Sequence, residues 1–333
     1  MQTGKPLTNL LLGLCAGLTA CGVPAGDFEH HPETQAFITA MVERHQFDRN
    51  QLEALFADAR KRDDILKAIA RPAESKPWYE YRPIFMTQSR IDGGVDFWRA
   101  HSAILKKAEQ AYGVDAAMIV AIIGVETRYG ANTGSYRVID ALSTLAFEYP
   151  PRAKFFRSEL EQFLILAREE GLDLREAKGS YAGAMGYGQF IPSSYRNYAV
   201  DFDADGSRDL WVSLEDIIGS VANYFQRHGW KLGEPVASRV SGKASIPDSL
   251  VSSGLKPSKT VADFARAGIS SNPKLNDDQR VALLELEQRN GPEYWLTTDN
   301  FYTITRYNRS PLYAMAVFQL SEAIRDAYQN RED

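Results

Sequence analysis

One carboxylate, Glu126, stands on an otherwise apolar stretch of the sequence. Ile119, Ile122 and Ile123 precede it at helical spacing, so in a helix these four side chains share one face. A carboxylate on an apolar face loses solvation, and in the last turn of a helix the macrodipole disfavours a second negative charge. Both effects predict a raised pKa for Glu126. Such an acid can protonate a glycosidic oxygen, although a glutamate at a frayed helix end gives the same pattern.

A second group of acids has the spacing of a calcium-binding loop. Asp201, Asp203 and Asp205 occupy loop positions 1, 3 and 5, and Gly206 occupies position 6. Position 12, which supplies a bidentate glutamate in the strict motif, is Val212. The strict motif therefore fails, and only a lengthened loop could complete the site. The alternative is a solvated turn rich in aspartate.

A glycine-rich segment, Ser180–Pro192, contains Gly183, Gly186 and Gly188. No strand pattern precedes it, so it is not a dinucleotide-binding fingerprint. Glycine allows close approach of the backbone and unusual φ angles, which would let main-chain groups and Gln189 reach the hydroxyls of a sugar polymer. The alternative is a tight structural loop.

The elements that would position these groups are mostly helical. Asp115 is a plausible N-cap for the helix that carries Glu126, and Gly130 a plausible glycine after its end. The stretch Trp78–Phe85 is expected to be irregular and rich in aromatic residues. Apolar residues recur at helical spacing over 33–70, 94–110, 115–129, 153–170, 214–229 and 311–328.

The residue composition and the pattern of apolar residues change between about 235 and 300. Prolines punctuate short β-prone pieces such as 236–240 and 294–298, which predicts a small inserted subdomain that contains strands. The fold class is therefore mainly α (α+β): a helical core with an N-terminal helical domain and this inserted subdomain.

The first residues read as a secretion signal. The apolar run Leu10–Leu18 is too short to span a bilayer and follows the positive charge of Lys5. Leu18-Thr-Ala-Cys21 resembles a bacterial lipobox, in which Cys21 is lipidated and becomes the new N-terminus; a chance cysteine in an ordinary signal is the alternative. Residue 22 is Gly rather than Asp, which resembles outer-membrane sorting. The other cysteine, Cys15, would be lost on cleavage, so no disulfide is expected.

The overall composition and net charge limit the classes of partner that the protein can bind. The chain has 333 residues, a formal net charge of −5 and no basic block, which argues against electrostatically driven binding of nucleic acid. A lipid anchor would hold the protein at a membrane surface without spanning the membrane.

Several separate motifs occur along the chain in this order: Lys76–Pro83 (KPWYEYRP), Glu126–Gly130 (ETRYG), Ser180–Pro192, Gly219–Phe225 and Asn300–Ala316. Together they resemble the membrane-bound lytic transglycosylase B family, and the resemblance runs from about Trp78 to the last helix. It implies a lysozyme-like core.

The resemblance implies that Glu126 is the catalytic residue and that no cofactor takes part in catalysis. Most glycosidases need two carboxylates, and no second acid lies in a comparable motif here. Lytic transglycosylases resemble the substrate-assisted exception, in which one Glu is acid and then base and the product is a 1,6-anhydromuramic acid. The expected cut is the β-1,4 bond between N-acetylmuramic acid and N-acetylglucosamine in peptidoglycan, in wall turnover or remodelling.

The resemblance also implies which side chains contact the substrate. After Tyr149-Pro150 the family often has two arginines, whereas this chain has Pro151 and Arg152, which puts the contact of Arg152 with a carboxylate in doubt. The predicted substrate-binding residues are Tyr81, Arg152, Ser180, Met185, Gln189, Tyr224, Tyr307, Asn308 and Tyr313. Packing in the core is the alternative for Met185 and for each tyrosine.

The family carries an EF-hand-like loop, so the resemblance favours a structural Ca²⁺ site, which Na⁺ could also occupy. The loop would close on Glu215 or Asp216, and the match at Gly219-Ser220 favours Asp216. Ser207 would contribute its backbone carbonyl. The predicted ligands are Asp201, Asp203, Asp205, Ser207 and Asp216.

The predicted organisation is a signal peptide (1–20), a tether (21–32), an N-terminal helical domain (33–100), a lysozyme-like catalytic core with the acidic loop (101–234), a β-containing subdomain (235–299) and a C-terminal return to the core (300–333). The expected location is the periplasmic face of the outer membrane of a Gram-negative bacterium.

The expected partners are peptidoglycan glycan strands and, through the anchor only, the membrane; no nucleic acid is expected. Enzymes of wall synthesis or hydrolysis are candidate partners, and a monomer is predicted. Two alternatives stay open at this point. One is a goose-type muramidase that uses water, and the other is a peptidoglycan-binding lipoprotein without catalytic activity.

Overall fold

The computed structural model describes Met1 and residues 26–70, 76–241, 246–251 and 254–330. Apart from Met1, the predicted signal peptide lies outside the described residues, and so does Cys21, the predicted lipidation site. The chain is mainly helical with one five-stranded sheet, which confirms the predicted fold class.

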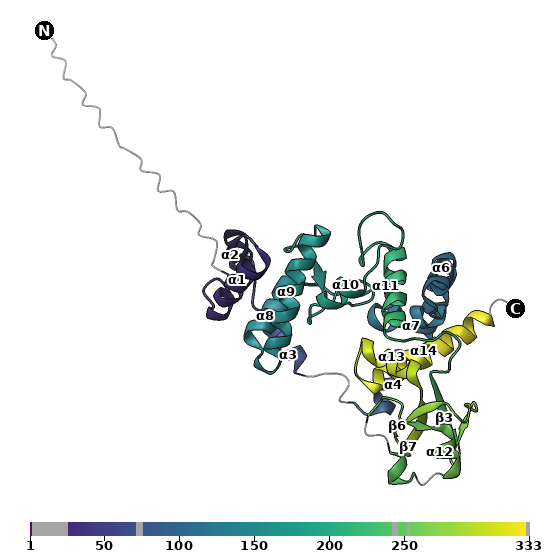
Figure 1. Cartoon of the computed structure of the whole chain (residues 1–333). Helices are drawn as coiled ribbons and strands as arrows, with labels where there is room; N and C mark the ends of the chain where they lie inside the picture. Colours follow the sequence, from purple (N-terminus) through teal and green to yellow (C-terminus); the bar gives the residue numbers. More distant parts are fainter. Residues whose placement is uncertain (2–25, 71–75, 242–245, 252–253, 331–333) are drawn as a thin grey trace.

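The helices form two groups (Figure 1). In the first group, Phe147 of α8 contacts the rings of Phe37 in α1 and Phe56 in α2, so aromatic packing joins elements far apart in the sequence. The first group comprises α1 (Pro32–His45), α2 (Arg49–Asp58), α3 (Asp63–Ile69), α8 (Val138–Glu148) and α9 (Ala153–Glu170).

The second group surrounds the helix that carries Glu126. The short helix α10 (Pro192–Tyr198) contacts both α9 and α11 and so links the two groups. The second group comprises α4 (Trp78–Phe85), α5 (Gln88–Ala100), α6 (Ser102–Tyr112), α7 (Ala116–Thr127), α11 (Leu214–Arg227), α13 (Asp299–Tyr307) and α14 (Pro311–Gln329).

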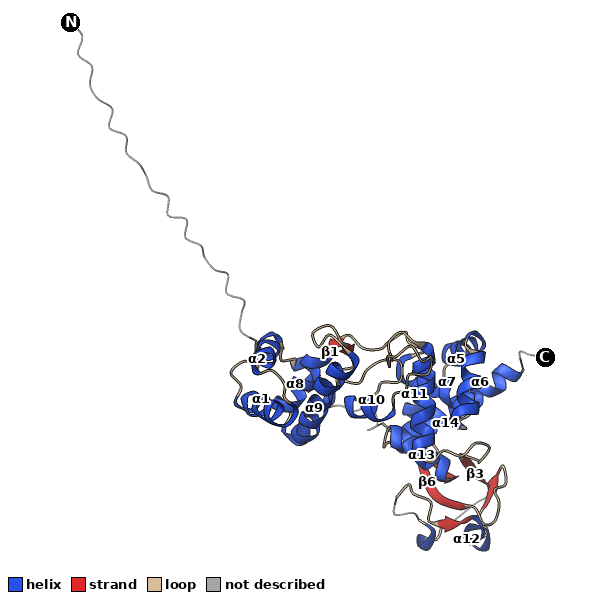
Figure 2. Cartoon of the chain, turned by 45° about the horizontal axis from the view of Figure 1, so that its top comes forward, coloured by secondary structure: helices blue, strands red, loops and turns tan. Residues whose placement is uncertain are grey.

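The strands of the larger sheet gather at one end of the molecule (Figure 2). Their order is β4-β6-β7-β3-β5 and every pairing is antiparallel, with the β6–β7 hairpin at the centre. This sheet confirms the predicted strand-containing subdomain. Its elements are β3 (Ala237–Ser241), β4 (Lys259–Thr260), α12 (Val261–Arg266), β5 (Ser270–Asn272), β6 (Arg280–Gln288) and β7 (Gly291–Thr297); a separate two-stranded sheet pairs β1 (Tyr136–Arg137) with β2 (Lys178–Gly179).

Helix α7 lies at the centre of the second group, against α5, α6, α11 and α14. Every residue of α7 is buried except Glu126. The three isoleucines are therefore part of a helix that is apolar all round, rather than of one apolar stripe. In the described part of the chain no single helix is long and apolar enough to cross a membrane, and α6 with α7 meets that test only as a pair bent by 113°.

Three local predictions differ from the structure. Trp78–Phe85 is the helix α4 rather than an irregular stretch, because buried Trp78 and Tyr81 anchor it although Pro83 lies inside it. The helix predicted over 94–110 is two helices, α5 and α6, that meet at His101. Asp115 precedes α7 but makes no side-chain cap bond, and its carboxylate lies 3.5 Å from the Arg325 guanidinium.

The predicted division at residue 100 does not follow the packing. Helices α1 to α3 belong with α8 and α9, whereas α4 and α5 pack against α14 and α7. The N-terminal stretch therefore serves both groups, and its second half helps to build the surroundings of Glu126.

Candidate active site

Glu126 meets a buried phenol at the end of α7. The Tyr313 hydroxyl, from the first turn of α14, donates a hydrogen bond to Glu126 Oε1 at 2.5 Å. Burial raises the pKa of Tyr313 well above its usual value, and the negative charge of Glu126 raises it further. The phenol therefore stays protonated near neutral pH and acts as a donor, which holds the carboxylate in one orientation.

Tyr307 and Tyr224 extend this site as an aromatic wall. The Tyr307 hydroxyl donates to the Gly188 carbonyl at 2.6 Å, and burial followed by the charge of Glu126 raises its pKa. The Tyr224 ring lies 4.7 Å from the Tyr307 ring, and its hydroxyl donates to the Arg306 carbonyl at 2.5 Å. Both hydroxyls are thus engaged with the backbone, and these tyrosines fix the glycine-rich loop and α13 next to Glu126.

Thr127 and Gly130 connect the end of α7 to the glycine-rich loop. The Thr127 hydroxyl donates to the Tyr187 carbonyl and accepts from the Gly130 amide, both at 3.0 Å. Gly130 has φ of 89°, and a Cβ there would lie 2.0 Å from the Tyr187 ring. Gly130 does not end the helix as predicted, because Arg128 and Tyr129 take the left-handed conformation first.

Tyr129 is inserted between glycines of α5 and α7, a contact that no sequence motif predicts. A Cβ at Gly93, Gly94 or Gly124 would meet its ring or hydroxyl at 2.5 to 3.0 Å. The Tyr129 hydroxyl donates to the Arg90 carbonyl at 2.6 Å, and the buried Arg90 guanidinium donates to the Gly124 carbonyl. This arrangement satisfies carbonyls at the end of α7 and fixes the turn after Glu126.

Two of the predicted substrate contacts serve the loop itself. The Ser180 hydroxyl accepts from the Ala184 amide at 3.1 Å, and Gln189 Nε2 donates to the Gly186 and Thr133 carbonyls at 2.9 and 3.1 Å. Both residues are partly exposed, so their contacts with substrate stay predictions.

Other predicted contacts lie further from solvent. Met185 is fully buried, so its side chain is not accessible to substrate in this structure. Its position agrees with the alternative, packing in the core. Tyr81 is 2% exposed in α4, where its ring stacks on Trp78 at 6.3 Å, and its contact with substrate stays a prediction.

The remaining two predicted contacts have local partners. Arg152 is exposed and lies over the ring of Phe155 at 4.4 Å. Asn308, which follows α13, accepts from the Ser310 amide at 3.0 Å. Contact of either residue with substrate stays a prediction.

The acidic loop brings three of its predicted ligands together. Carboxylate oxygens of Asp201, Asp203 and Asp205 lie within 4.8 Å of one another. Backbone amides hold this arrangement: Gly206 donates to Asp201 at 2.9 Å and Ser207 to Asp205 at 2.8 Å. Oxygen donors at this spacing fit a hard cation such as Ca²⁺.

Asp216, the predicted residue that closes the loop, is hydrogen-bonded to backbone amides of the loop. It is 1% exposed, and its two oxygens accept from the Phe202 amide at 2.7 Å and the Asp209 amide at 2.8 Å. Burial raises its pKa, while these hydrogen bonds act in the opposite direction. Asp216 thus joins the two ends of the loop from behind and is not one of the three clustered acids. Glu215 is not in that cluster either.

A helical core that presents one carboxylate to a neutral phenol, beside a glycine-rich loop and tyrosines, defines a lysozyme-like glycan-cleaving class. A family model described as "Transglycosylase SLT domain" matches residues 29–322. "Membrane-bound lytic murein transglycosylase B" of Escherichia coli (strain K12) is 44% identical over 333 residues, 97% of this chain and 90% of that protein. The chain belongs to this family of lytic transglycosylases.

Solved structures agree. The Escherichia coli lytic transglycosylase Slt35 in complex with calcium matches with a TM-score of 0.83 and 46% identity, over 91% of this chain and 96% of that one. SltB3 from Pseudomonas aeruginosa in complex with NAG-NAM-pentapeptide matches with a TM-score of 0.79 and 31% identity, over 88% of this chain and 79% of that one.

Proposed function

We propose that this protein cleaves peptidoglycan glycan strands at the β-1,4 bond between N-acetylmuramic acid and N-acetylglucosamine, with Glu126 as acid and then base. The observation that carries the proposal is the hydrogen bond from Tyr313 to Glu126 at the one position of α7 that is not buried.

In the first step Glu126 gives its proton to the glycosidic oxygen, and the bond from that oxygen to the muramic acid C1 breaks. The N-acetyl group of the same sugar stabilises the cationic carbon. Tyr313 stabilises the negative charge that forms on Glu126, because its hydroxyl already donates to Oε1.

In the second step ionised Glu126 takes the proton of the sugar's own 6-hydroxyl, and that oxygen bonds to C1. The ring closes as a 1,6-anhydro product and the acid is regenerated, so no water is consumed. Tyr313 donates to Glu126, whereas the Tyr307 hydroxyl donates to the Gly188 carbonyl. Both phenols have raised pKa values and stay protonated, so neither supplies the anion that a two-carboxylate mechanism requires.

Mass spectrometry of digested peptidoglycan tests this reaction. The proposal predicts muropeptides that end in anhydromuramic acid. Products that end in reducing muramic acid would instead identify a muramidase that uses water. Intact strands under conditions where the protein is folded and binds them would favour the non-catalytic lipoprotein.

A structural Ca²⁺ is the second part of the proposal. Asp201, Asp203 and Asp205 would hold it, with the Ser207 carbonyl as a further ligand. The cation would neutralise three carboxylates that lie close together and secure the segment between α10 and α11. The support is the preformed loop and the calcium complex of Slt35, and the ion has no part in the chemistry at Glu126.

The third part of the proposal is a lipid anchor on Cys21 that holds the enzyme at the periplasmic face of the outer membrane. The lipobox-like sequence and the membrane-bound name of the Escherichia coli relative support it. Metabolic labelling with a fatty acid should mark the parent protein and not Cys21→Ser, which should leave the membrane fraction. Equal labelling of both proteins would contradict the anchor.

A further inference from the structure

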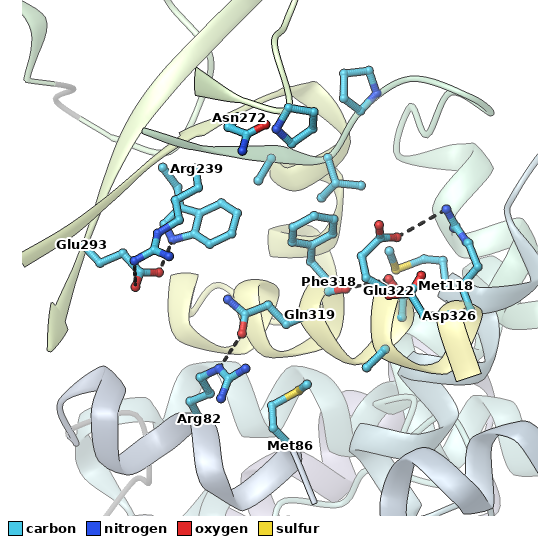
Figure 3. Close-up of a pocket in the computed structure, with 18 of the residues that line it drawn as sticks. Arg82, Met86, Met118, Arg239, Asn272, Glu293, Phe318, Gln319, Glu322 and Asp326 are labelled. Carbon is cyan, nitrogen blue, oxygen red and sulfur yellow. Dashed lines mark hydrogen bonds and ion pairs between the residues drawn. The ribbon is translucent and has the colours of Figure 1, made fainter. Parts of the chain in front are cut away.

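A cavity of about 1060 Å³ lies between the sheet, α14 and α4 (Figure 3). Glu126 does not line it. At 100° per residue, Phe318 and Glu322 lie about 140° and 180° around α14 from Tyr313. The cavity and the candidate active site therefore use opposite faces of the same helix.

Glu293 organises the wall that the sheet contributes. Its carboxylate, 14% exposed, accepts from Trp295 Nε1 at 2.6 Å, from the Arg239 guanidinium at 3.1 Å and from Gln288 Nε2 at 3.2 Å. Arg239 lies opposite Trp295 across the β3–β7 pair, so the guanidinium and the indole share one face of the sheet. One partly buried acid thus fixes an aromatic ring, a guanidinium and an amide that all line the cavity.

The helical wall adds an aromatic ring and negative charge. The Phe318 ring lies 6.2 Å from the Trp295 ring at 84°, an edge-to-face pair that joins α14 to the sheet. Glu322 and exposed Asp326 follow on the same face of α14, and Arg325 pairs with Glu322 at 3.3 Å. Burial raises the pKa of Glu322, Arg325 acts in the opposite direction, and the charge of Asp326 raises it again. At the base, Arg82 of α4 donates to Gln319 Oε1 at 2.6 Å.

The charges of the two walls indicate what kind of ligand fits. Arg239, whose side chain is 61% exposed, can take a carboxylate without leaving Glu293, because a guanidinium has five N–H donors. On the opposite wall, Asp326 and Glu322 can take an ammonium group. The rings of Trp295 and Phe318 offer apolar faces between them. A neutral glycan needs no paired charges of opposite sign, whereas a peptide that carries both carboxylates and an amine does.

We infer that this cavity is a second binding site that takes the peptide portion of peptidoglycan, with Arg239 on a carboxylate and Asp326 with Glu322 on an amine. The inference rests on the proposed function, since it takes its ligand from the same polymer. A site on the far face of α14 would hold the enzyme on the wall between cleavages and raise the effective concentration of strands at Glu126.

Calorimetry on the whole protein carrying Glu126→Gln, which leaves strands intact, tests the inference. The probe is the N-acetylglucosamine–N-acetylmuramic acid disaccharide with a pentapeptide, beside the same disaccharide without peptide and the free pentapeptide. The free pentapeptide should bind with a stoichiometry of one peptide per protein molecule. Arg239→Ser should weaken that binding about tenfold, the loss of one charge-assisted hydrogen bond.

Arg266→Ser is the matched control, since Arg266 is also an exposed arginine of this subdomain paired with an acid, Asp263. It should leave binding unchanged.

Asp326→Asn should weaken the amine contact and leave the folded sheet untouched. Hydrogen exchange gives a second readout on the Glu126→Gln protein that carries no substitution in the cavity. The free pentapeptide should slow the exchange of backbone amides in β7 and α14.

Two results would overturn the inference: no binding of free pentapeptide, or binding that Arg239→Ser and Asp326→Asn leave unchanged while β7 and α14 gain no protection. The proposed function fails separately, through products without anhydromuramic acid. Peptide binding with such products would keep the second site and refute the reaction.

Discussion

The carboxylate at the end of α7 and the aspartates of the loop at 201–205 are held in opposite ways. Glu126 is oriented by a side chain 187 positions away, the Tyr313 phenol, and lies among buried aromatic residues. Asp201, Asp203 and Asp205 are held by amides within the same loop. One site depends on the tertiary packing of α7 against α14, whereas the other depends mainly on local turn geometry.

This difference predicts how each site fails. Changes around Glu126 should affect catalysis first, because the acid must meet one oxygen of the substrate at a fixed position. Changes in the acidic loop should affect stability first, because three close carboxylates repel one another unless a cation neutralises them. The experiments below test that contrast, from the largest expected effect to the smallest.

Glu126→Gln should reduce cleavage of peptidoglycan at least about a thousandfold, because the amide can neither give nor take the proton. Strand binding and the melting temperature should change little. The control is Glu109→Gln, a partly exposed carboxylate of α6 outside both sites, which should keep activity within about twofold. Cleavage by Glu126→Gln at the parent rate would remove Glu126 from the mechanism.

Gly130→Ala should lower the free energy of unfolding by about 3 kcal/mol, because the new methyl meets the Tyr187 ring and the φ of 89° is strained for alanine. Gly171→Ala is matched to it: φ is 67°, and nothing lies within 4 Å of the added Cβ. It should cost only about 1 kcal/mol. Urea denaturation measures both, and equal losses would show that contact with Tyr187 adds nothing.

Tyr313→Phe should lower kcat about 10- to 30-fold with little change in KM, because it removes the hydroxyl that orients Glu126 and stabilises its charge. The matched control is Tyr112→Phe, a phenol of α6 that is also partly desolvated. Steady-state kinetics on soluble glycan strands should leave this control at parental values. A loss confined to KM would make Tyr313 a binding residue instead.

Ca²⁺ should raise the melting temperature of the parent protein, and a chelator should reverse the gain. Asp201→Ala combined with Asp205→Ala should abolish the shift and leave kcat within about threefold, because the loop is structural. Asp277→Ala with Asp278→Ala, an exposed pair in the sheet subdomain, should retain it. If Ca²⁺ does not change the melting temperature of the parent protein, the result would contradict the metal site.

The contrast also explains what could be predicted from the sequence. Spacing in the sequence is sufficient to predict the aspartate cluster, because Asp201, Asp203 and Asp205 lie close together in a single loop. Spacing cannot assign Asp216, whose oxygens are taken by the Phe202 and Asp209 amides only once α11 packs behind the loop.

At the active site, the pattern before Glu126 predicts a helix but not its complete burial, which depends on every neighbouring helix. Tyr313 was predicted by resemblance alone. Tyr129 and Arg90 were missed, although Gly93, Gly94 and Gly124 are a signal: glycines in two helices indicate that something bulky packs between them.

The most direct test of the central assignment is digestion of peptidoglycan in water enriched in heavy oxygen, followed by mass spectrometry of the new muramic acid ends. The 6-hydroxyl of the sugar replaces water in the proposed mechanism, so the new ends should be anhydro forms that carry no label. Reducing ends that carry one heavy oxygen per cut would contradict attack by the 6-hydroxyl and would identify a muramidase that uses water.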